Sequence, residues 1–145
     1  MGPRDDIDRL HDEVRELVDE LWRLPRFAGG RRGFRPQVDC VRGEDPPALH
    51  VVVELPGVDP ASIKVVAADR VLVVAGERRR PPLRGRYRQL EIEYGPFQRR
   101  IPLDEPIDPG SATARYEHGM LTVELPIAPK PPGAERVAIA ISRNS

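Results

Sequence analysis

Two hydrophobic periodicities divide the chain, and the first is helical. From Arg4 to Leu24, apolar side chains recur at alternating steps of three and four residues, which places them on one face of an α-helix. Three aspartates lie in the opening turn, where carboxylates favour the positive end of the helix dipole. Pro25 ends the pattern, and the glycine-rich stretch Phe27–Gly33 is typical of a hinge. The pattern therefore predicts an amphipathic helical arm with the apolar positions Ile7, Leu10, Val14, Leu17 and Leu21, and with Trp22 and Phe27 near its end.

From Phe34 to Ile127 the period changes to two, which is typical of half-buried strands. Turn signals such as Pro56-Gly57 separate the alternating segments, and no helical pattern lies between them to supply the crossovers of a parallel sheet. This region is predicted to be all-β, an immunoglobulin-like antiparallel β-sandwich. Its expected strands are Leu49–Leu55, Ile63–Ala67, Val71–Val74, Phe97–Leu103, Ala112–Tyr116 and Leu121–Leu125.

The C-terminal segment, Ala128–Ser145, begins as a proline-rich tether and continues into the alternating apolar stretch Val137–Ile141. A short strand on a tether is not stable alone, so we expect it to dock on another surface. The predicted organisation is thus an arm (1–33), a sandwich domain (34–127) and a C-terminal tether (128–145).

Composition excludes several classes of protein. The 145 residues allow one domain with a core, and 23 basic side chains balance 23 acidic ones, so no net charge attracts nucleic acid or membrane. Aromatics make up only 5%, which predicts a core of Val, Leu, Ile and Ala. The single cysteine, Cys40, excludes an internal disulfide and suits a reducing compartment. Without a signal-peptide pattern or an apolar run of roughly 20 residues, we expect a cytoplasmic protein that does not span a membrane.

Five segments share an order and spacing that point to one family. Gly119–Pro126 reads GMLTVELP, and the others are Val53–Val65, Val71–Glu77, Tyr94–Arg99 and Ile139–Ile141. Together they resemble the α-crystallin domain of the small heat-shock proteins, including its G-x-L-x-V-x-L-P strand and its C-terminal I-x-I motif. Two positions depart from that pattern: His118 replaces the usual Asn or Asp, and Pro102 lies near the end of a strand that is commonly free of proline.

The GMLTVELP segment also has a direct physical interpretation. Gly119 allows a turn with positive φ, Leu121, Val123 and Leu125 point into the core, and Pro126 ends the strand. The motif thus predicts a scaffold strand and does not itself bind a client.

The resemblance implies ATP-independent holding of partly unfolded client proteins by a homo-oligomer that is assembled from dimers and loosens under stress. It also implies hand-over to ATP-dependent refolding chaperones, with no cofactor, metal or catalysis. The residues agree, because the three histidines lack a ligand spacing such as H-E-x-x-H and Cys40 has no catalytic signature around it.

Three segments are candidates for binding, and the first is the tail. In an extended peptide Ile139 and Ile141 point the same way while Ala140 points out, and Val137 with Ile139 offers a second register. The resemblance implies docking between two strands of a neighbouring subunit, against Ile63, Val65, Ala67, Ala112, Ala114 and Tyr116. The alternative is that the tail is a strand of the chain's own sheet.

The second candidate is the arm, whose apolar face packs on the sandwich or on another helix in the resting assembly. Client capture on release of the arm is a further hypothesis.

The third candidate is Arg78–Tyr94, where six arginines up to Arg88 raise the alternative of nucleic-acid binding. That alternative is disfavoured because Tyr87 is the only nearby stacking group and Glu91 and Glu93 follow. The resemblance instead implies a dimer loop carrying a strand that pairs with a partner's edge, through Tyr87, Leu90, Ile92 and Tyr94. Arg99 is expected to form an ion pair or hydrogen bond across the dimer or within the sheet.

Two other functions stay open on sequence. One is a co-chaperone or adaptor with the same sandwich that binds one specific partner, which the docking tail disfavours. The other is the arginine-dependent nucleic-acid binder.

Overall fold

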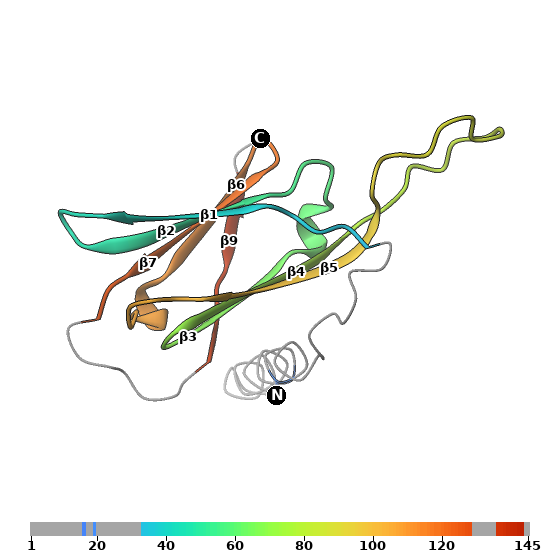
Figure 1. The fold of residues 1–145 in the computed structure, drawn as a ribbon. Coiled ribbons are helices and arrows are strands. Elements are labelled where there is room, and N and C mark those ends of the chain that lie inside the picture. Colours follow the sequence, from blue (N-terminus) through green and yellow to red (C-terminus); the bar gives the residue numbers. More distant parts are fainter. Residues whose placement is uncertain (1–15, 17–18, 20–32, 129–135, 144–145) are drawn as a thin grey trace, which may run out of the picture.

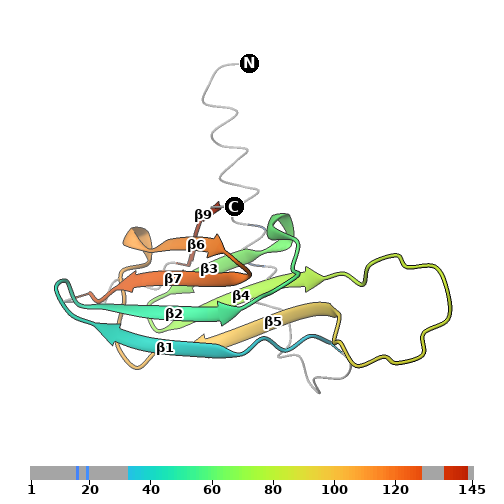
Figure 2. The same cartoon turned by 90° about the horizontal axis from the view of Figure 1, so that it is seen from above.

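A computed structural model describes residues 16, 19, 33–128 and 136–143, and in these residues the chain forms two facing β-sheets (Figures 1 and 2). The five-stranded sheet has the order β1-β2-β7-β6-β9, and the four-stranded sheet has the order β5-β4-β3-β8. The strands are β1 Val38–Gly43, β2 Ala48–Glu54, β3 Lys64–Ala68, β4 Val71–Arg78, β5 Gly95–Pro102, β6 Thr113–Glu117, β7 Met120–Pro126, β8 Val137–Ala138 and β9 Ile141–Arg143, with 3-10 turns η1 Pro60–Ser62 and η2 Pro109–Ser111. The predicted all-β sandwich is confirmed.

The core is built on the pairing of β2 with β7. Leu49 lies opposite Leu125, Val51 opposite Val123 and Val53 opposite Leu121, and these six side chains are at most 2% exposed. Val65 and Ala67 of β3 and Leu72 and Val74 of β4 belong to the same cluster from the other sheet. Burial of each large aliphatic side chain contributes about 1.5–3 kcal/mol to the stability of the folded state. The alternating apolar positions therefore supply much of the free energy that holds the two sheets together.

The turn into β7 confirms the role predicted for Gly119. Gly119 has φ +77 and His118 before it has φ 53, so both residues occupy the left-handed region. A Cβ at Gly119 would lie 3.0 Å from the Cα of Pro56, and the Leu55 N–H donates to the Gly119 carbonyl at 2.7 Å. Glycine is therefore needed here both for its backbone angles and for the close approach of the β2–η1 connection.

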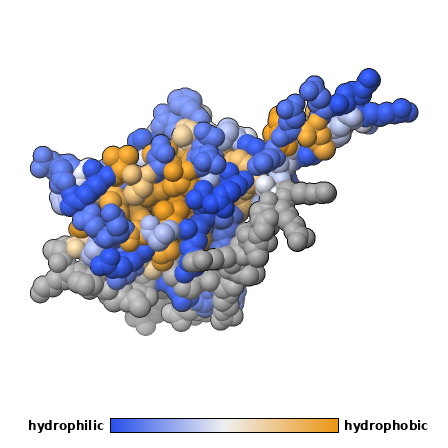
Figure 3. Space-filling view, viewed as in Figure 1, coloured by the Kyte–Doolittle hydropathy of each residue, from blue (hydrophilic) through white to orange (hydrophobic). Residues whose placement is uncertain are grey.

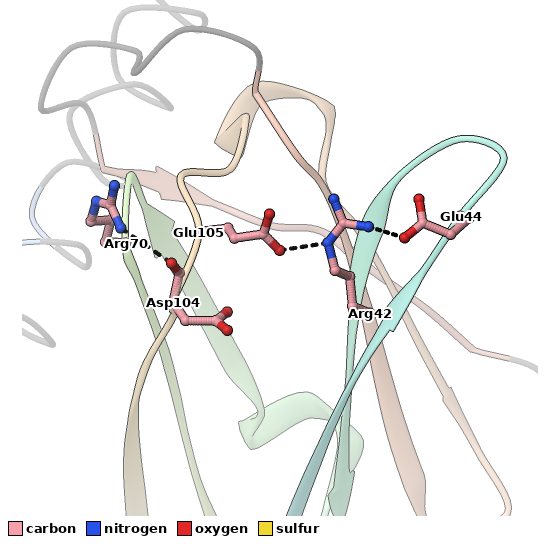
Figure 4. A network of polar contacts seen from close by, with 5 residues as sticks. All are labelled: Arg42, Glu44, Arg70, Asp104 and Glu105. Atoms are coloured by element: carbon pink, nitrogen blue, oxygen red, sulfur yellow. Dashed lines mark hydrogen bonds and ion pairs between the residues drawn. The ribbon is translucent and has the colours of Figure 1, made fainter.

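Strand β1 was not predicted, because its sequence VDCVRG has no clear alternation and four of its six residues are exposed. It is an edge strand, and its far end is held by a polar network (Figure 4). Arg42 donates to the Glu105 carboxylate at 2.7 Å and also pairs with Glu44, while Arg70 donates to the Asp104 carbonyl at 3.4 Å. The network joins β1 to the segment that follows β5.

Pro102 lies at a position of the sheet that tolerates proline. It is the last residue of β5, and β5 is the edge strand of the four-stranded sheet, so no ladder hydrogen bond is lost inside the sheet. Residues 79–94, between β4 and β5, project away from the sandwich as a long loop (Figures 1 and 2).

The predicted helical arm lies almost entirely outside the described residues. Glu16 and Asp19 are described, and both are helical. The apolar positions Ile7, Leu10, Val14, Leu17, Leu21, Trp22 and Phe27 are not among the residues that the structure describes.

Candidate functional site

The C-terminal tail lies across an open side of the sandwich and touches both sheets. β8 pairs antiparallel with β3 of the four-stranded sheet, with Val66 opposite Ala138. β9 pairs parallel with β6 of the five-stranded sheet, with Ala114 opposite Ile141. Only two residues separate these strands, so the tail passes directly from one sheet to the other (Figure 1).

The isoleucines of the tail point toward the core. Ile139 is 8% exposed, and its N–H donates to the Val65 carbonyl at 2.8 Å. Ala140 is exposed, and Ile141 is half-buried against the core cluster. Ser142 adds a hydrogen bond from its hydroxyl to the Ala114 carbonyl at 3.3 Å. This alternation is what an extended peptide gives when its backbone pairs with a strand edge.

All six residues named from the sequence as a docking groove lie in the core cluster or pack against it, and two of them, Ile63 and Val65, line the groove beside the tail. The core cluster that contains Ile139 also includes Ile63, Val65, Ala67 and Ala114. Ala112 and Tyr116 are partly buried and pack against this cluster. A groove of about 380 Å³ remains beside the tail, between the η1–β3 corner and Ala138–Ile141.

In the described chain the tail contacts its own groove, with Val137 half-buried at its start. The expectation that the groove of a neighbouring subunit receives the tail concerns an assembly, and it stays a prediction.

Tyr116 lies on β6, beside the tail strand β9. Its hydroxyl donates to the Leu55 carbonyl at 2.7 Å and lies 3.4 Å from the Val58 carbonyl. Burial raises the pKa of Tyr116, and the hydrogen bond to Val58 opposes this shift to a lesser extent. The tyrosine thus ties β6 to the connection that follows β2, a contact that the sequence pattern gave no sign of.

The loop of residues 79–94 presents apolar side chains to solvent. Tyr87, Leu90 and Ile92 are all exposed, and so is Leu83, whereas Tyr94 is half-buried at the base of the loop. Figure 3 shows apolar side chains on this projecting loop among hydrophilic ones. The strand expected in the loop is not formed among the described residues, since a strand there would need an edge to pair with, and the loop extends away from both sheets.

Arg78 anchors the base of this loop. Its guanidinium lies 3.8 Å from the centre of the Phe34 ring and 5.5 Å from that of Tyr94. It donates to the Glu93 carbonyl through Nε at 2.9 Å and to the Pro56 carbonyl through Nη1 at 3.2 Å. One side chain therefore joins the segment before β1, the end of β2 and the end of the loop.

The stacking extends in both directions from Arg78. Phe34 meets Phe97 edge to face, with ring centres 5.6 Å apart, and Arg80 lies 4.6 Å from the centre of Tyr94 and 5.1 Å from that of Tyr87. Arginines placed over aromatic faces are attracted by the ring quadrupole. The series thus runs from a buried phenylalanine of β5 out along the loop.

Arg99 bonds within its own chain. Its Nη1 donates to the Pro36 carbonyl at 2.5 Å, which links β5 to the segment before β1. Burial lowers the pKa of Arg99, and the neighbouring charge of Arg35 lowers it further. A contact of Arg99 across a dimer stays a prediction.

Other kinds of site find no support in the described part of the chain. No group of three or more His, Cys, Asp or Glu side chains there is arranged to hold a metal ion. None of the helices among those residues has the length and hydropathy to cross a membrane.

Comparison with known proteins gives consistent matches. The model of the Hsp20/alpha crystallin family matches residues 42–142. Heat shock protein 16 of Schizosaccharomyces pombe is 32% identical over 134 residues, which cover 90% of this chain and 91% of that protein. The 19.0 kDa class II heat shock protein of Oryza sativa subsp. japonica is 39% identical over 105 residues, covering 64% of this chain and 60% of the rice protein.

Solved structures agree with the sequence matches. Heat shock protein 16.0 from Schizosaccharomyces pombe superposes with a TM-score of 0.59 at 31% identity, covering 74% of this chain and 99% of that one. A small heat-shock protein from Xylella fastidiosa, described as having a distinct high order structure, gives a TM-score of 0.56 at 32% identity, covering 72% and 96% of the two chains.

Proposed function

Because this chain belongs to the Hsp20/alpha crystallin family, we propose that it is an ATP-independent molecular chaperone that binds partly unfolded proteins and prevents their aggregation. It works as a homo-oligomer assembled from dimers and has no catalytic activity. The observation that carries the proposal is the tail, which has Ile139 buried in a groove between the two sheets while a tether separates it from the domain. A peptide on a tether that leaves its own groove can bind the same groove on another copy of the chain.

The dimer forms when the loop of one chain pairs with the β1 edge of another. β1 is the last strand of its sheet, so one edge is open within the described chain, and Val41 on it is exposed. Leu90, Ile92 and Tyr94 supply an alternating face on the loop. In a strand-addition contact, an extended segment of one molecule pairs with an open strand edge of another. This chain has both features.

Higher assembly follows from exchange of the tail. A contact with two isoleucines is weak alone, and repetition over many subunits strengthens it while allowing subunits to exchange. Partly unfolded clients bind the apolar surfaces that loosening exposes, and ATP-dependent chaperones then refold them. A reducing compartment such as the cytoplasm suits a chain with Cys40 as its single cysteine.

The adaptor alternative predicts a different state in solution. An adaptor with the same sandwich would be a monomer or dimer bound to one partner, and its tail would stay on its own groove. Nucleic-acid binding is disfavoured because Arg78 stacks on the ring of Phe34 and Arg80 on that of Tyr94.

Light scattering after size exclusion tests the proposal on the full chain. We expect large particles for the wild type and particles close to dimers for Ile139→Ser combined with Ile141→Ser. Ala140→Ser is the matched control, because that side chain is exposed and should leave the particle mass unchanged. A wild type that is monomeric at micromolar concentration would rule out the oligomeric chaperone.

Chaperone activity is measured separately by heating a labile dehydrogenase with the protein in the absence of nucleotide. We expect less light scattering from the aggregating client. A full-length protein that forms large particles yet leaves client aggregation unchanged would contradict the proposed activity.

A further inference from the structure

The outer face of the four-stranded sheet is apolar on β3 and β4, whereas the neighbouring strand β5 places Gln98 and Arg100 on it. Side chains alternate along a strand, so the core residues of β3 and β4 leave Val66 and Val73 pointing away from the five-stranded sheet, with Ala68 and Ala75 beside them. Val66 and Val73 are direct cross-strand neighbours. In a two-layer sandwich this face normally meets water and carries polar side chains.

This apolar face is nevertheless buried. Val66 and Val73 are both 0% exposed, although none of the described strands lies on that side of the sheet (Figure 1). The corresponding face of the other sheet behaves as expected for a solvated surface: His50 and Val52 of β2 are half-buried, and Glu124 of β7 is exposed. The outer face of one sheet is therefore covered and that of the other is not.

An ion pair at the edge of this sheet indicates what covers the face. The Asp19 carboxylate lies 3.5 Å from Nη1 of Arg136. Arg136 directly precedes β8, which pairs with β3 beside Val66. Asp19 is helical and lies inside the amphipathic span Arg4–Leu24. The N-terminal segment thus reaches the edge of the sheet whose outer face is covered.

We propose that the apolar stripe of residues 4–24 packs on the outer face of β3 and β4 of its own chain, with the Asp19–Arg136 ion pair fixing it at the β8 edge. The dimensions agree, since a helix of this span is about 30 Å long and strands of five to eight residues run about 17–26 Å. An amphipathic helix on the exposed face of a sheet turns the two layers into three and buries both apolar surfaces.

The proposed docking of the arm has a consequence for client binding. This consequence rests on the proposed chaperone function, whereas the docking itself does not. Release of the arm would expose two apolar surfaces at once, the stripe of the helix and the face around Val66 and Val73. The resting protein hides both.

The single tryptophan, Trp22, lies in the proposed docked segment and reports its surroundings. In the full chain, Val73→Thr changes the outer face without changing side-chain size, and we expect its Trp22 emission to shift to longer wavelength and its acrylamide quenching to increase. Val52→Thr is the matched control, because Val52 lies on the outer face of the other sheet. Unchanged emission in a folded Val73→Thr protein, or an equal shift in Val52→Thr, would overturn the proposal.

A cross-link keeps the test decisive if Val73→Thr does not fold. Asp19 and Arg136 are both partly exposed, so Asp19→Cys with Arg136→Cys, in a Cys40→Ser background, spares the core. A short bismaleimide should join the two cysteines within one chain, as shown by mass spectrometry on mixed isotope-labelled subunits. Asp19→Cys with Glu124→Cys, on the opposite face, should not cross-link.

Cross-links that form only between labelled and unlabelled chains would show that a neighbour's arm covers the face, and would overturn docking within the chain. Client aggregation is assayed on the same variants. A shift of Trp22 emission in Val73→Thr without any change in client protection would leave the docking standing and contradict its consequence for the chaperone.

Discussion

The guanidinium of Arg78 lies 3.8 Å from the centre of the Phe34 ring, and through this contact the end of β4 holds both the segment before β1 and the projecting loop. A planar cation suits this place because it stacks on rings with its face and donates to carbonyl groups with its edge. A lysine has the charge but neither the plane nor the fork of donors.

Arg78→Lys should therefore free the loop. We expect a loss of about 1–2 kcal/mol in the free energy of unfolding, from the stacking and the charged hydrogen bonds, and faster trypsin cleavage within residues 79–94. Arg79→Lys is the control, because Arg79 is well exposed and, among the described residues, forms an ion pair only with the half-buried Glu77. Equal cleavage rates in the two variants would show that Arg78 does not position the loop.

Tyr116→Phe should make the domain less stable and change its response to alkali. Loss of the hydroxyl that donates to the Leu55 carbonyl should cost about 1 kcal/mol. Because burial raises the pKa of Tyr116 in the folded state, its contribution is fully present below the unfolded tyrosine pKa of about 10 and is lost as the pH rises through the folded pKa.

Urea titrations at a series of alkaline pH values measure this. The wild type should lose stability above a pH of about 10 more steeply than Tyr116→Phe. Parallel curves for the two proteins would mean that Tyr116 does not cause the alkaline loss.

Gly119→Ala should strain the turn into β7. A left-handed backbone angle and a Cβ 3.0 Å from the Cα of Pro56 act together, and we expect a loss of about 1–2 kcal/mol in thermal or urea unfolding. At Gly110 a Cβ would lie at an ordinary contact distance of 3.5 Å from Oδ1 of Asp108. Gly110→Ala should therefore change stability much less, and an equal loss at both positions would refute this account.

Ile92→Ser should weaken the proposed dimer without weakening the fold. Ile92 is exposed on the loop, so the unfolding free energy of the domain should change by less than about 0.5 kcal/mol. Native mass spectrometry at low concentration should show more monomer. Leu83→Ser is the matched control, because Leu83 is also exposed on the loop but lies outside the alternating Leu90–Tyr94 face. The loop interface is excluded if both variants dissociate alike.

The fold was largely predictable because the central strands obey a simple rule. Leu49–Leu55 and Leu121–Leu125 alternate, and each alternation is satisfied by burial on one face. β1 escaped prediction because an edge strand with exposed Val41 on one face and Arg42 on the other carries no such pattern. Edge strands are specified by pairing with a neighbour more than by their own residues.

The site was only partly predictable. Alternation in Val137–Ile141 indicated a docking peptide, but the groove residues came from the family resemblance. The anchor at Arg78 depends on residues 34, 56 and 94, which only the folded chain brings together. The covered outer face coincides with the consecutive pairs Val65-Val66 and Val73-Val74, which break the alternation, as happens when both faces of a sheet are buried. Val51-Val52-Val53 breaks it in the same way on an outer face that is not covered, so the pattern alone does not identify the covered sheet.

The two-residue spacing between β8 and β9 makes release of the tail a single event. With only Ile139 and Ala140 between the strand on β3 and the strand on β6, a half that detaches stays close to its edge and pairs again at high effective concentration while the other half holds. Lasting release therefore requires both halves to detach, and both edges then become available together. Such coupling gives a threshold, so that tail occupancy should respond to temperature or to competitor concentration as a cooperative switch.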